Sequence, residues 1–348
     1  MKLNIKSITL IILLIIFASI LLYSNILYYP IYCKNNDIVL NIENNDTALD
    51  VAMELEEYEC INPAIFKLGI YFTFNQYNVK PGLYKLKNVN TNSDLIRLIT
   101  SDSREKINFT IYEGWTINQI ADALEKKFNI NKEKFLKICY DQNFIKSKFL
   151  DYDIPSLEGF LFPDTYTFLS TYNEYDIINI LIKRFLKVYS DNFSSYQSSY
   201  KFNMIEIVTL ASIVQSEAMM EDEMPLISSV YHNRINKKYK LEADPTILYY
   251  MSPDDLKKFK GSPQSKEAVK IFRKYKKIKN KYNTYIYKGL IPGPICNPGI
   301  HAIKAALNPL KTSKTYLYFV ADGTGRHIFS ETLKEHKSAI NRIRYGFK

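Results

Sequence analysis

One carboxylate stands at the end of an apolar helical run, in the stretch LASIVQSE (Leu210–Glu217). Helical spacing places Leu210, Val214 and Glu217 on one stripe, because residues three, four and seven apart share a face of a helix. We therefore expect the Glu217 carboxyl to leave an apolar wall beside the helix end. Desolvation there, with the acidic side chains of Glu221 and Asp222 nearby, would raise its pKa. A carboxyl that stays protonated near neutral pH can serve as a general acid.

A simpler interpretation is that Glu217 is an ordinary glutamate at a helix end. Most such glutamates are solvated or pair with a nearby cation, here for example Arg234. Spacing alone favours this second interpretation, because structural ion pairs also perturb pKa values and are more numerous than catalytic acids. The other motifs of the chain must decide between the two.

The N-terminal segment indicates in which compartment this carboxylate works. Ile8–Leu27 contains no charged residue, and twenty helical residues rise about 30 Å, the thickness of a hydrocarbon core. The run is longer than the apolar part of a signal peptide and lacks a small-residue cleavage site. Tyr28 and Tyr29 stand where an interfacial aromatic belt belongs, and Lys2 and Lys6 favour a cytoplasmic N-terminus. We expect a single-pass anchor in the cytoplasmic (inner) membrane, with the remaining chain outside the cytoplasm.

Composition excludes several classes of protein. The 348 residues, 47% hydrophobic and 24% charged, are typical of a globular chain of two or three domains. The net charge of +10 comes from scattered Lys and Arg without a basic and aromatic face, so no nucleic-acid partner is expected. The cysteines form no CxxC pair and the histidines no HExxH motif, which predicts neither a metal nor a cofactor. Whether the cysteines pair stays open; they are Cys33, Cys60, Cys139 and Cys296.

The chain after the anchor alternates short strands and helices. We expect strands at Asp37–Ile42 and within Val79–Leu86, and helices within Thr47–Ile61, Asn62–Phe72 and Asn90–Ser101. Asn92 or Ser93 is the expected cap of the last helix. A second unit begins with a strand at Ile107–Ile111, followed by the turn Glu113-Gly114 and a helix that Thr116 could cap. This strand, turn and helix resemble the small LysM-like modules that hold glycan strands.

The C-terminal half is predicted to be mainly helical. Leu157–Phe168 is aromatic and interrupted by Pro163, which indicates a loop or an irregular sheet edge, and Ile177–Ser190 has helical periodicity. A serine-rich link, Ser190–Lys201, precedes further helices and a strand within Lys314–Asp322. The lysine-rich segment 253–281 shows no clear periodicity; we expect a solvated face, and contact with anionic wall material is the alternative.

Seven motifs occur in an order that resembles one family of enzymes. They are EGFLFPDTY (158–166), LASIVQSE (210–217), VYHNRI (230–235), LEADPTILY (241–249), YNTY (282–285), GLIPGPICNPG (289–299) and YLYFVADGTGRH (316–327). With the N-terminal anchor they are similar to the endolytic murein transglycosylase family (MltG, or YceG-like). Any one motif is a weak signal, whereas seven in order cover essentially the whole chain.

The resemblance implies membrane-anchored lyases that cut nascent peptidoglycan, with a LysM-like subdomain before the catalytic domain. The fold class is then α+β: an N-terminal transmembrane helix, a small LysM-like α/β region, and a mainly helical catalytic domain with a few strands. The implied ranges are 1–7 for the cytoplasmic end, 8–28 for the anchor, 35–150 for the LysM-like region and 155–348 for the catalytic domain. Peptidoglycan glycan strands are the implied substrate, and peptidoglycan synthases are a partner that the sequence leaves open.

The resemblance also implies a single glutamate as acid and base, in the I-V-x-x-E position that Glu217 occupies. Gln215 and Ala218 depart from the acidic-lysine-glutamate-threonine pattern common there, which puts the rate in doubt. The matching motifs supply further candidates for binding the sugar: Glu158, Asn233, Asp244, Thr246, Asn283 and Tyr285. Each has a structural alternative; Asp244, before Pro245, could equally cap a helix.

Lytic transglycosylation needs one carboxyl where most glycosidases need two. The acid protonates the oxygen between N-acetylmuramic acid and N-acetylglucosamine, and its conjugate base then takes the proton of the muramic C6 hydroxyl. That hydroxyl attacks C1 intramolecularly, which gives a 1,6-anhydro end without water. The alternatives are a hydrolase with the same fold and a non-catalytic, membrane-tethered scaffold that binds peptidoglycan in the elongation or division machinery.

Overall fold

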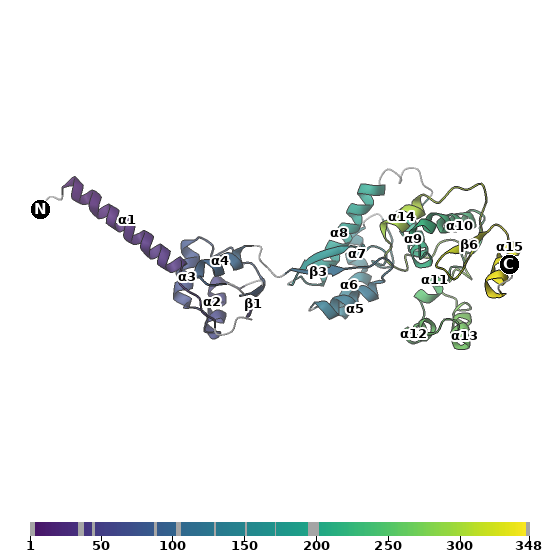
Figure 1. Ribbon diagram of the computed structural model, residues 1–348, viewed down its shortest axis with the longest axis horizontal. Coiled ribbons are helices and arrows are strands. Elements are labelled where there is room, and N and C mark those ends of the chain that lie inside the picture. The colour runs from purple at the N-terminus through teal and green to yellow at the C-terminus, as the bar shows by residue number, and fades with distance from the viewer. Residues whose placement is uncertain are drawn as a thin grey trace. The chain divides into compact units, whose positions relative to one another are not determined.

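The chain folds into two compact units of mixed, mainly helical structure (Figure 1). The computed structural model describes residues 4–33, 38–43, 46–86, 89–101, 106–128, 130–149, 152–170, 172–193 and 202–345. Unit 1 comprises Met1–Phe109 with Tyr166–Tyr172, and unit 2 comprises Thr110–Thr165 with Asn173–Lys348. The domain boundaries expected at 35–150 and 155–348 remain predictions.

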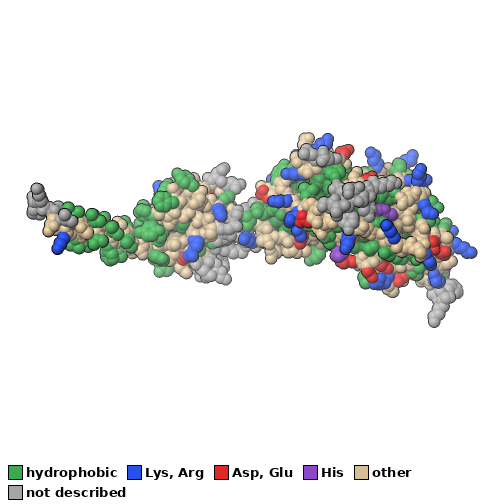
Figure 2. Space-filling model, turned by 90° about the horizontal axis from the view of Figure 1, so that it is seen from above, with side chains coloured by type: hydrophobic (Ala, Val, Ile, Leu, Met, Phe, Trp, Pro, Cys, Tyr) green, Lys and Arg blue, Asp and Glu red, His purple; other side chains and the backbone are tan. Residues whose placement is uncertain are grey.

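Unit 1 begins with one long apolar helix, α1 (Ile5–Leu27). Its segment Lys6–Leu27 has a mean hydropathy of 2.7 and is long and apolar enough to cross a membrane. Figure 2 shows hydrophobic side chains along this helix and on the neighbouring part of unit 1. Length and composition therefore fit the anchor expected from the sequence.

Between Val39 and Thr100, unit 1 packs three helices with a two-stranded sheet. The elements are β1 (Val39–Ile42), α2 (Ala48–Glu57), α3 (Pro63–Phe72), β2 (Gly82–Lys85) and α4 (Asn92–Thr100). β1 and β2 pair antiparallel, with Leu40 opposite Tyr84, and both of these side chains are buried. The expected strands and helices are thus present in the expected order; Asp37, the first residue of the expected strand 37–42, lies outside the described residues.

The predicted cap of α4 at Asn92 or Ser93 is wrong. Thr91 is the cap, because its hydroxyl accepts from the Asp94 N–H at 3.2 Å while the Asp94 carboxylate accepts from the Thr91 N–H. The Asn92 amide instead donates to the carbonyls of Ile26 in α1 and Ile65 in α3, each at 3.1 Å. This one buried side chain therefore joins three helices.

Unit 2 is built around α9 (Met204–Glu217), which packs against α10 (Met224–Asn236), α11 (Asp244–Tyr249) and α14 (Ile300–Leu307). All but one of the residues from Met204 to Val214 are buried, the exception being Glu206 of the N-terminal capping box with Asn203. A helix that is apolar around its whole circumference belongs in the interior of a domain. The sequence indicated an apolar stripe, and the structure extends it to all sides of the helix.

The remaining elements are β3 (Lys106–Thr110) and β4 (Thr165–Leu169), which lie mostly in unit 1, and the other helices and strands of unit 2. Those of unit 2 are α5 (Ile117–Lys127), α6 (Lys132–Tyr140), α7 (Gln142–Lys148), α8 (Glu174–Phe193), the 3-10 helix η2 (Glu221–Glu223), α12 (Pro253–Gly261), α13 (Lys266–Tyr275), β5 (Tyr318–Ala321), β6 (His327–Ser330) and α15 (Leu333–Tyr345). Two further two-stranded sheets pair β3 with β4 and β5 with β6. Thr116 caps α5 as expected. Of the predicted serine-rich link, residues 194–201 lie outside the described residues.

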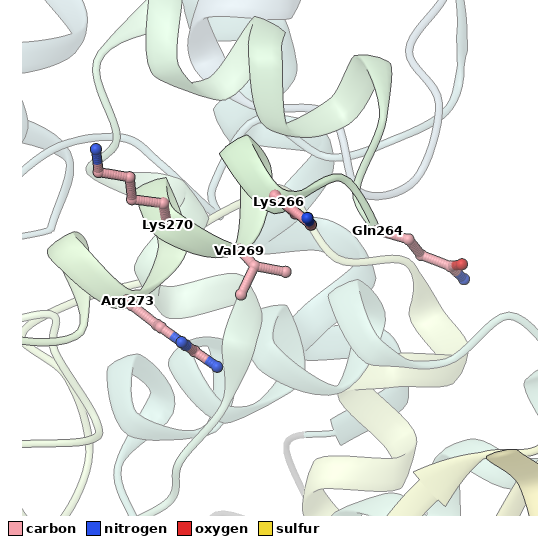
Figure 3. Close-up of a pocket in the computed structure, with 5 residues that line it drawn as sticks. All are labelled: Gln264, Lys266, Val269, Lys270 and Arg273. Carbon is pink, nitrogen blue, oxygen red and sulfur yellow. The ribbon is translucent and has the colours of Figure 1, made fainter.

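The lysine-rich segment 253–281 is not aperiodic, as the sequence suggested, but forms α12 and α13. Ser252 and Ser265 cap the two helices, and α13 buries Ala268, Ile271 and Tyr275 on one face. The opposite side carries the cations, and an open hollow of about 380 Å³ lies among them. Figure 3 shows its lining: Gln264, Lys266, Val269, Lys270 and Arg273. The lysines between the apolar positions hid this periodicity in the sequence.

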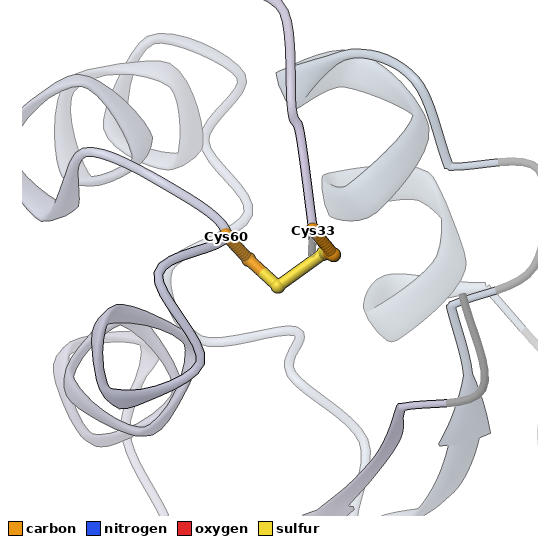
Figure 4. The surroundings of a disulfide bond; sticks show 2 residues. All are labelled: Cys33 and Cys60. Carbon is orange, nitrogen blue, oxygen red and sulfur yellow. A yellow bond between two sulfur atoms is a disulfide. The ribbon is translucent and has the colours of Figure 1, made fainter. Parts of the chain in front are cut away.

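Cys33 and Cys60 form a disulfide in unit 1 (Figure 4), which answers the pairing question for two of the four cysteines. The bond joins residues 27 positions apart. Closing a loop of this length stabilises a fold by about 3–4 kcal/mol, chiefly because it restricts the unfolded chain. Cys139 and Cys296 are buried free thiols of unit 2.

Reduction of this disulfide is expected to destabilise unit 1 by about 3–4 kcal/mol. Urea unfolding of the full chain with and without a reductant measures the difference. The Cys33→Ser, Cys60→Ser double variant serves as control, since the reductant should leave its unfolding curve unchanged. Four alkylatable thiols in the oxidised, denatured protein would show that the bond does not form.

Candidate active site

Glu217 is the last residue of α9. Ala218 ends the helix with an extended backbone, and the chain then enters η2. The helical face that carries Glu217 therefore does not continue to Met220 and Glu221. Leu210 and Val214, by contrast, are fully buried on the stripe that leads to Glu217. The carboxyl thus leaves an apolar wall at the helix C-terminus, where the helix dipole disfavours a negative charge.

The surroundings of Glu217 bring the pKa of its carboxyl close to neutral pH. Burial raises the pKa of Glu217 from 4.5 to about 7, against a lowering by the hydrogen bond from Tyr231. The Tyr231 hydroxyl donates to Glu217 Oε1 at 2.8 Å, and the tyrosine side chain is itself buried. The charge of Asp244 raises the pKa of Glu217 further, and that of Arg234 lowers it. At neutral pH both the acid and its conjugate base are therefore populated.

The neighbours of Glu217 are not those expected from the sequence. The predicted upward direction of its pKa is confirmed, but the acidic residue that contributes is Asp244. Glu221 lies 3.6 Å from His301, and Asp222 pairs with Arg326 at 2.9 Å. These two acids are occupied elsewhere because the helix ends before reaching them.

Arg234, the cation that could have neutralised Glu217, binds a different segment. Its guanidinium donates to the carbonyls of Leu317 at 2.6 Å and Leu241 at 2.8 Å, and pairs with Glu242 at 3.2 Å. The group also lies over the ring of Tyr318, 5.1 Å from the centroid. Arg234 thus fixes the chain that leads into α11 and acts on Glu217 only through its charge.

Asp244 and Tyr285, two of the predicted binding residues, lie together. The predicted role of Asp244 as a helix cap is wrong: Ala243 is the N-cap of α11, and no side chain caps it. The Asp244 carboxyl instead accepts a hydrogen bond from the Tyr285 hydroxyl. Burial raises the pKa of Asp244, and the Lys276 ammonium, 3.5 Å from the centre of the Tyr285 ring, lowers it. Asp244 also lines an open hollow of about 310 Å³ together with Phe259, Pro263, Val269, Phe272, Arg273 and Lys276.

Three other predicted binding residues hold backbone segments in place. The Thr246 hydroxyl donates to the Ala243 carbonyl at 2.7 Å, and the Asn283 amide donates to the carbonyls of α13 and the chain after it. Both side chains are fully buried. The half-buried Asn233 donates to the Tyr316 carbonyl at 2.9 Å. A contact of any of these side chains with a sugar remains a prediction.

Glu158 is buried inside unit 2, with 1% of its surface exposed. Its Oε1 accepts from the Ile117 N–H at 3.0 Å and from the Asn297 amide at 3.2 Å, whereas Oε2 has no partner among the described residues. Burial raises the pKa of Glu158 to about 8, so the carboxyl is largely neutral at pH 7. The structure places it under the start of α5, and its predicted contact with the glycan remains a prediction.

Asn297 is a residue whose importance the sequence did not reveal. Its Oδ1 accepts from the Leu161 N–H at 2.9 Å, and its Nδ2 donates to the Trp115 carbonyl at 2.8 Å as well as to Glu158. The backbone N–H of Asn297 also donates to Trp115, and its carbonyl accepts from Gly114. The side chain is completely buried. Its place in a Gly- and Pro-rich run is typical of a loop and does not indicate a buried side chain.

The same loop contacts the end of α9 through Gln215. The Gly299 N–H donates to Gln215 Oε1 at 3.0 Å, and a Cβ at position 299 would overlap the Glu113 carboxyl. The Ile295 N–H donates to the Ser212 hydroxyl at 3.0 Å, one turn earlier in α9. Gln215 therefore faces the loop while Glu217 faces Tyr231. No cluster of three or more His, Cys, Asp or Glu side chains suited to a metal occurs within the part of the chain that the structure describes.

Comparison with known proteins adds a family and several relatives. The model of the YceG-like family matches residues 40–342. An endolytic murein transglycosylase of Bacillus subtilis is 30% identical over 341 residues, which cover 93% of this chain and 90% of the relative. An enzyme of the same name from Streptococcus pneumoniae is 28% identical over 332 residues, and the match spans 57% of its length. A 2.6 Å crystal structure of a YceG-like protein from Listeria monocytogenes has a TM-score of 0.55 at 30% identity, with 87% of this chain and 98% of that chain covered.

Proposed function

Because the chain belongs to the YceG-like family, we propose that it is a membrane-anchored endolytic peptidoglycan lytic transglycosylase with Glu217 as its single acid and base. The names of the curated relatives support the reaction class and the substrate. The observation that carries the assignment to one residue is the environment of Glu217. Its carboxyl is half-buried at a helix end, bonded to a buried tyrosine, with a pKa of about 7.

In the first step the protonated Glu217 gives its proton to the bridging oxygen between N-acetylmuramic acid and N-acetylglucosamine. Positive charge develops at C1 as that bond breaks. The Tyr231 hydroxyl, 2.8 Å from Oε1, stabilises the carboxylate that this step leaves behind. Partial burial of Glu217 at the end of α9 favours the protonated form that this step requires.

In the second step the carboxylate takes the proton of the muramic C6 hydroxyl, which attacks C1. Glu217 is thereby protonated again and no water is consumed, so proton and bond counts balance over the cycle. One group serves both steps well when its pKa is close to the working pH, because neither protonation state is then rare. The charge of Asp244 adds negative potential near Glu217, which favours the positive charge at C1.

The predicted sugar-binding residues divide into two groups. Asp244 and Tyr285 are hydrogen-bonded to each other, and the charge of Glu217 acts on Tyr285. We propose both residues as contacts of the sugar. Glu158, Asn233, Thr246 and Asn283 are proposed to act on the glycan through the segments that they hold. For 35–150 we propose a LysM-like glycan-holding region; the order β1–α2–α3–β2, with an antiparallel strand pair, supports it.

We also propose that α1 anchors the protein in the cytoplasmic membrane, with residues 1–7 in the cytoplasm and the catalytic region outside. The length and hydropathy of α1 support the span. The Cys33–Cys60 disulfide supports the side, because disulfides persist in oxidising compartments and are rare in the cytosol.

The test is the product made by the full chain in detergent from nascent, uncrosslinked glycan. We expect fragments with 1,6-anhydro ends, which mass spectrometry separates from reducing ends by the mass of one water. Reducing ends would indicate a hydrolase. Binding without any product would indicate the peptidoglycan-binding scaffold.

The pH dependence of kcat/KM is expected to report on the Glu217 proton. Since the first step needs the protonated acid, kcat/KM should fall about tenfold per pH unit above pH 7. Tyr231→Phe removes a hydrogen bond that lowers the pKa of Glu217, so the alkaline limb should move to higher pH. Tyr84→Phe, which removes a hydroxyl bonded to the Lys80 carbonyl in unit 1, serves as control and should leave the limb in place. A limb that moves to lower pH in Tyr231→Phe would contradict this prediction.

A further inference from the structure

Unit 1 carries an apolar surface on α3 and the turn after it. Five large side chains there point outward although they are apolar or aromatic. They are Leu68, Tyr71, Phe72, Phe74 and Tyr77, with exposed fractions of 48%, 51%, 44%, 82% and 90%. Leu68, Tyr71 and Phe72 share one face of α3 by helical spacing, and large apolar side chains exposed together mark a surface that something covers. We call these five residues the α3 surface.

The α3 surface adjoins the C-terminal end of α1. The rings of Phe72 and Tyr23 lie 6.2 Å apart in an edge-to-face arrangement, and α3 packs along the end of α1. Asn92 holds this contact in place, because its amide bonds the carbonyls of both helices and its N–H donates to Tyr29 O at 3.0 Å. Gly69 makes room for it, since a Cβ at position 69 would overlap the Asn92 amide. The junction of α1 with the unit is therefore packed and hydrogen-bonded.

This junction fixes the depth of the α3 surface relative to a bilayer. Tyr23 lies four residues before the end of α1, about 6 Å inside that end at the helical rise per residue. Phe72 touches Tyr23 and so lies at the boundary between hydrocarbon and headgroups, the level at which aromatic side chains are favoured. Tyr28 and Tyr29 stand at the same end of α1 and are exposed as well. The exposed Lys67 beside Leu68 suits anionic headgroups.

We propose that the α3 surface lies in the outer interface of the bilayer and holds unit 1 against the membrane. The proposal rests on the proposed anchoring by α1 and goes beyond it: the unit is docked on lipid and is not merely tethered by a flexible link. The contact of Phe72 with Tyr23 favours lipid as the occupant, since it joins the α3 surface to α1, the proposed membrane anchor. A protein partner on this patch would instead leave it out of reach of lipid tails.

The test measures how close single side chains come to lipid. Phe74→Cys and Tyr77→Cys are labelled in the full chain with bimane and reconstituted into bilayers that contain lipids brominated near the headgroup end of the tail. The native cysteines do not compete, because two are disulfide-bonded and two are buried. Leu49→Cys and Met53→Cys are the matched controls, as both are exposed apolar positions on α2 of the same unit. We expect quenching at least about threefold stronger at positions 74 and 77 than at 49 and 53.

A label at Ile16→Cys, in the middle of α1, separates the proposal from its premise. Quenching at position 16 together with equal, weak quenching at 74, 77, 49 and 53 would overturn the docking and leave the anchor intact. Absence of quenching at position 16 would refute the anchor and the docking with it. Positions 74 and 77 are highly exposed, so unchanged thermal unfolding of these variants is expected and serves as the check on folding.

Discussion

Glu217→Gln is expected to lower the rate of anhydro-product formation at least about 1,000-fold, since one group carries both proton transfers of the cycle. Glutamine keeps the size of the side chain, and its carbonyl can still accept the hydrogen bond from Tyr231. It can neither give nor take a proton at the bridging oxygen. The assay is the mass-spectrometric release of anhydro-ended fragments from uncrosslinked glycan by the two full-length proteins.

The loss must come from chemistry and not from unfolding. Wild type has to bury a carboxylate as the pH rises through a pKa of about 7, because the folded pKa lies above the ordinary 4.5. Stability that depends on this group is thus present at low pH and lost as the pH rises from 4.5 through 7. Glutamine avoids that cost, so the variant should be at least as stable as wild type at about pH 8.

Glu221→Gln is the matched control, because it makes the same chemical change one turn beyond the end of α9. We expect its rate to lie within about twofold of wild type, as for a surface substitution. Equal product from Glu217→Gln and wild type would transfer the acid to another carboxyl, with Asp244 the next to test.

Asn297→Ala is expected to destabilise unit 2 by about 3–4 kcal/mol, since it removes three hydrogen bonds of a fully buried side chain and leaves the Leu161 N–H without its partner. For a unit of this size the change corresponds to a midpoint of thermal unfolding lower by about 10 °C. Trp115 is the single tryptophan of the chain and lies at this contact, so its fluorescence reports the transition directly.

Asn192→Ala provides the comparison for this loss. The exposed Asn192 donates to the Val188 carbonyl within α8, and its removal should change stability by less than about 0.5 kcal/mol. A transition of Asn297→Ala at the wild-type temperature would show that the loop holds its place without this side chain. Reduced activity at temperatures well below the transition is also expected, because Gly299 of the same loop contacts the end of α9.

Local patterns predicted most of the elements and the buried stripe that leads to Glu217. The apolar period of Leu210–Val214, the strand alternation near Val39 and the cap at Thr116 depend on neighbours in the sequence, and the structure has all three. Each pattern reflects which side of an element is buried, a property that a short window of sequence records.

What the sequence did not predict are contacts between segments that are distant along the chain. Tyr231 lies fourteen residues after Glu217, and its sequence pattern is typical of a core residue. The chain turns through η2, and this turn brings the Tyr231 hydroxyl to the Glu217 carboxyl. Asn297 reads as part of a loop because its partner Trp115 lies 182 positions earlier. The place of Asp244 before Pro245 predicts a cap, but its carboxyl instead accepts a hydrogen bond from Tyr285. Tertiary partners of this kind leave no local signature.

The amide of Gln215 explains why one departure from the family pattern should not be reversed. Its oxygen accepts from Gly299, and its side chain is hydrogen-bonded to the Glu113 carboxyl. The amide offers an acceptor to one neighbour and a donor to the other, whereas an ionised carboxylate offers acceptors alone. Restoring the acidic residue common at this position would set two carboxylates against each other at the helix end. Consensus engineering, which often stabilises proteins, would therefore work against this chain at position 215 unless residue 113 were changed with it.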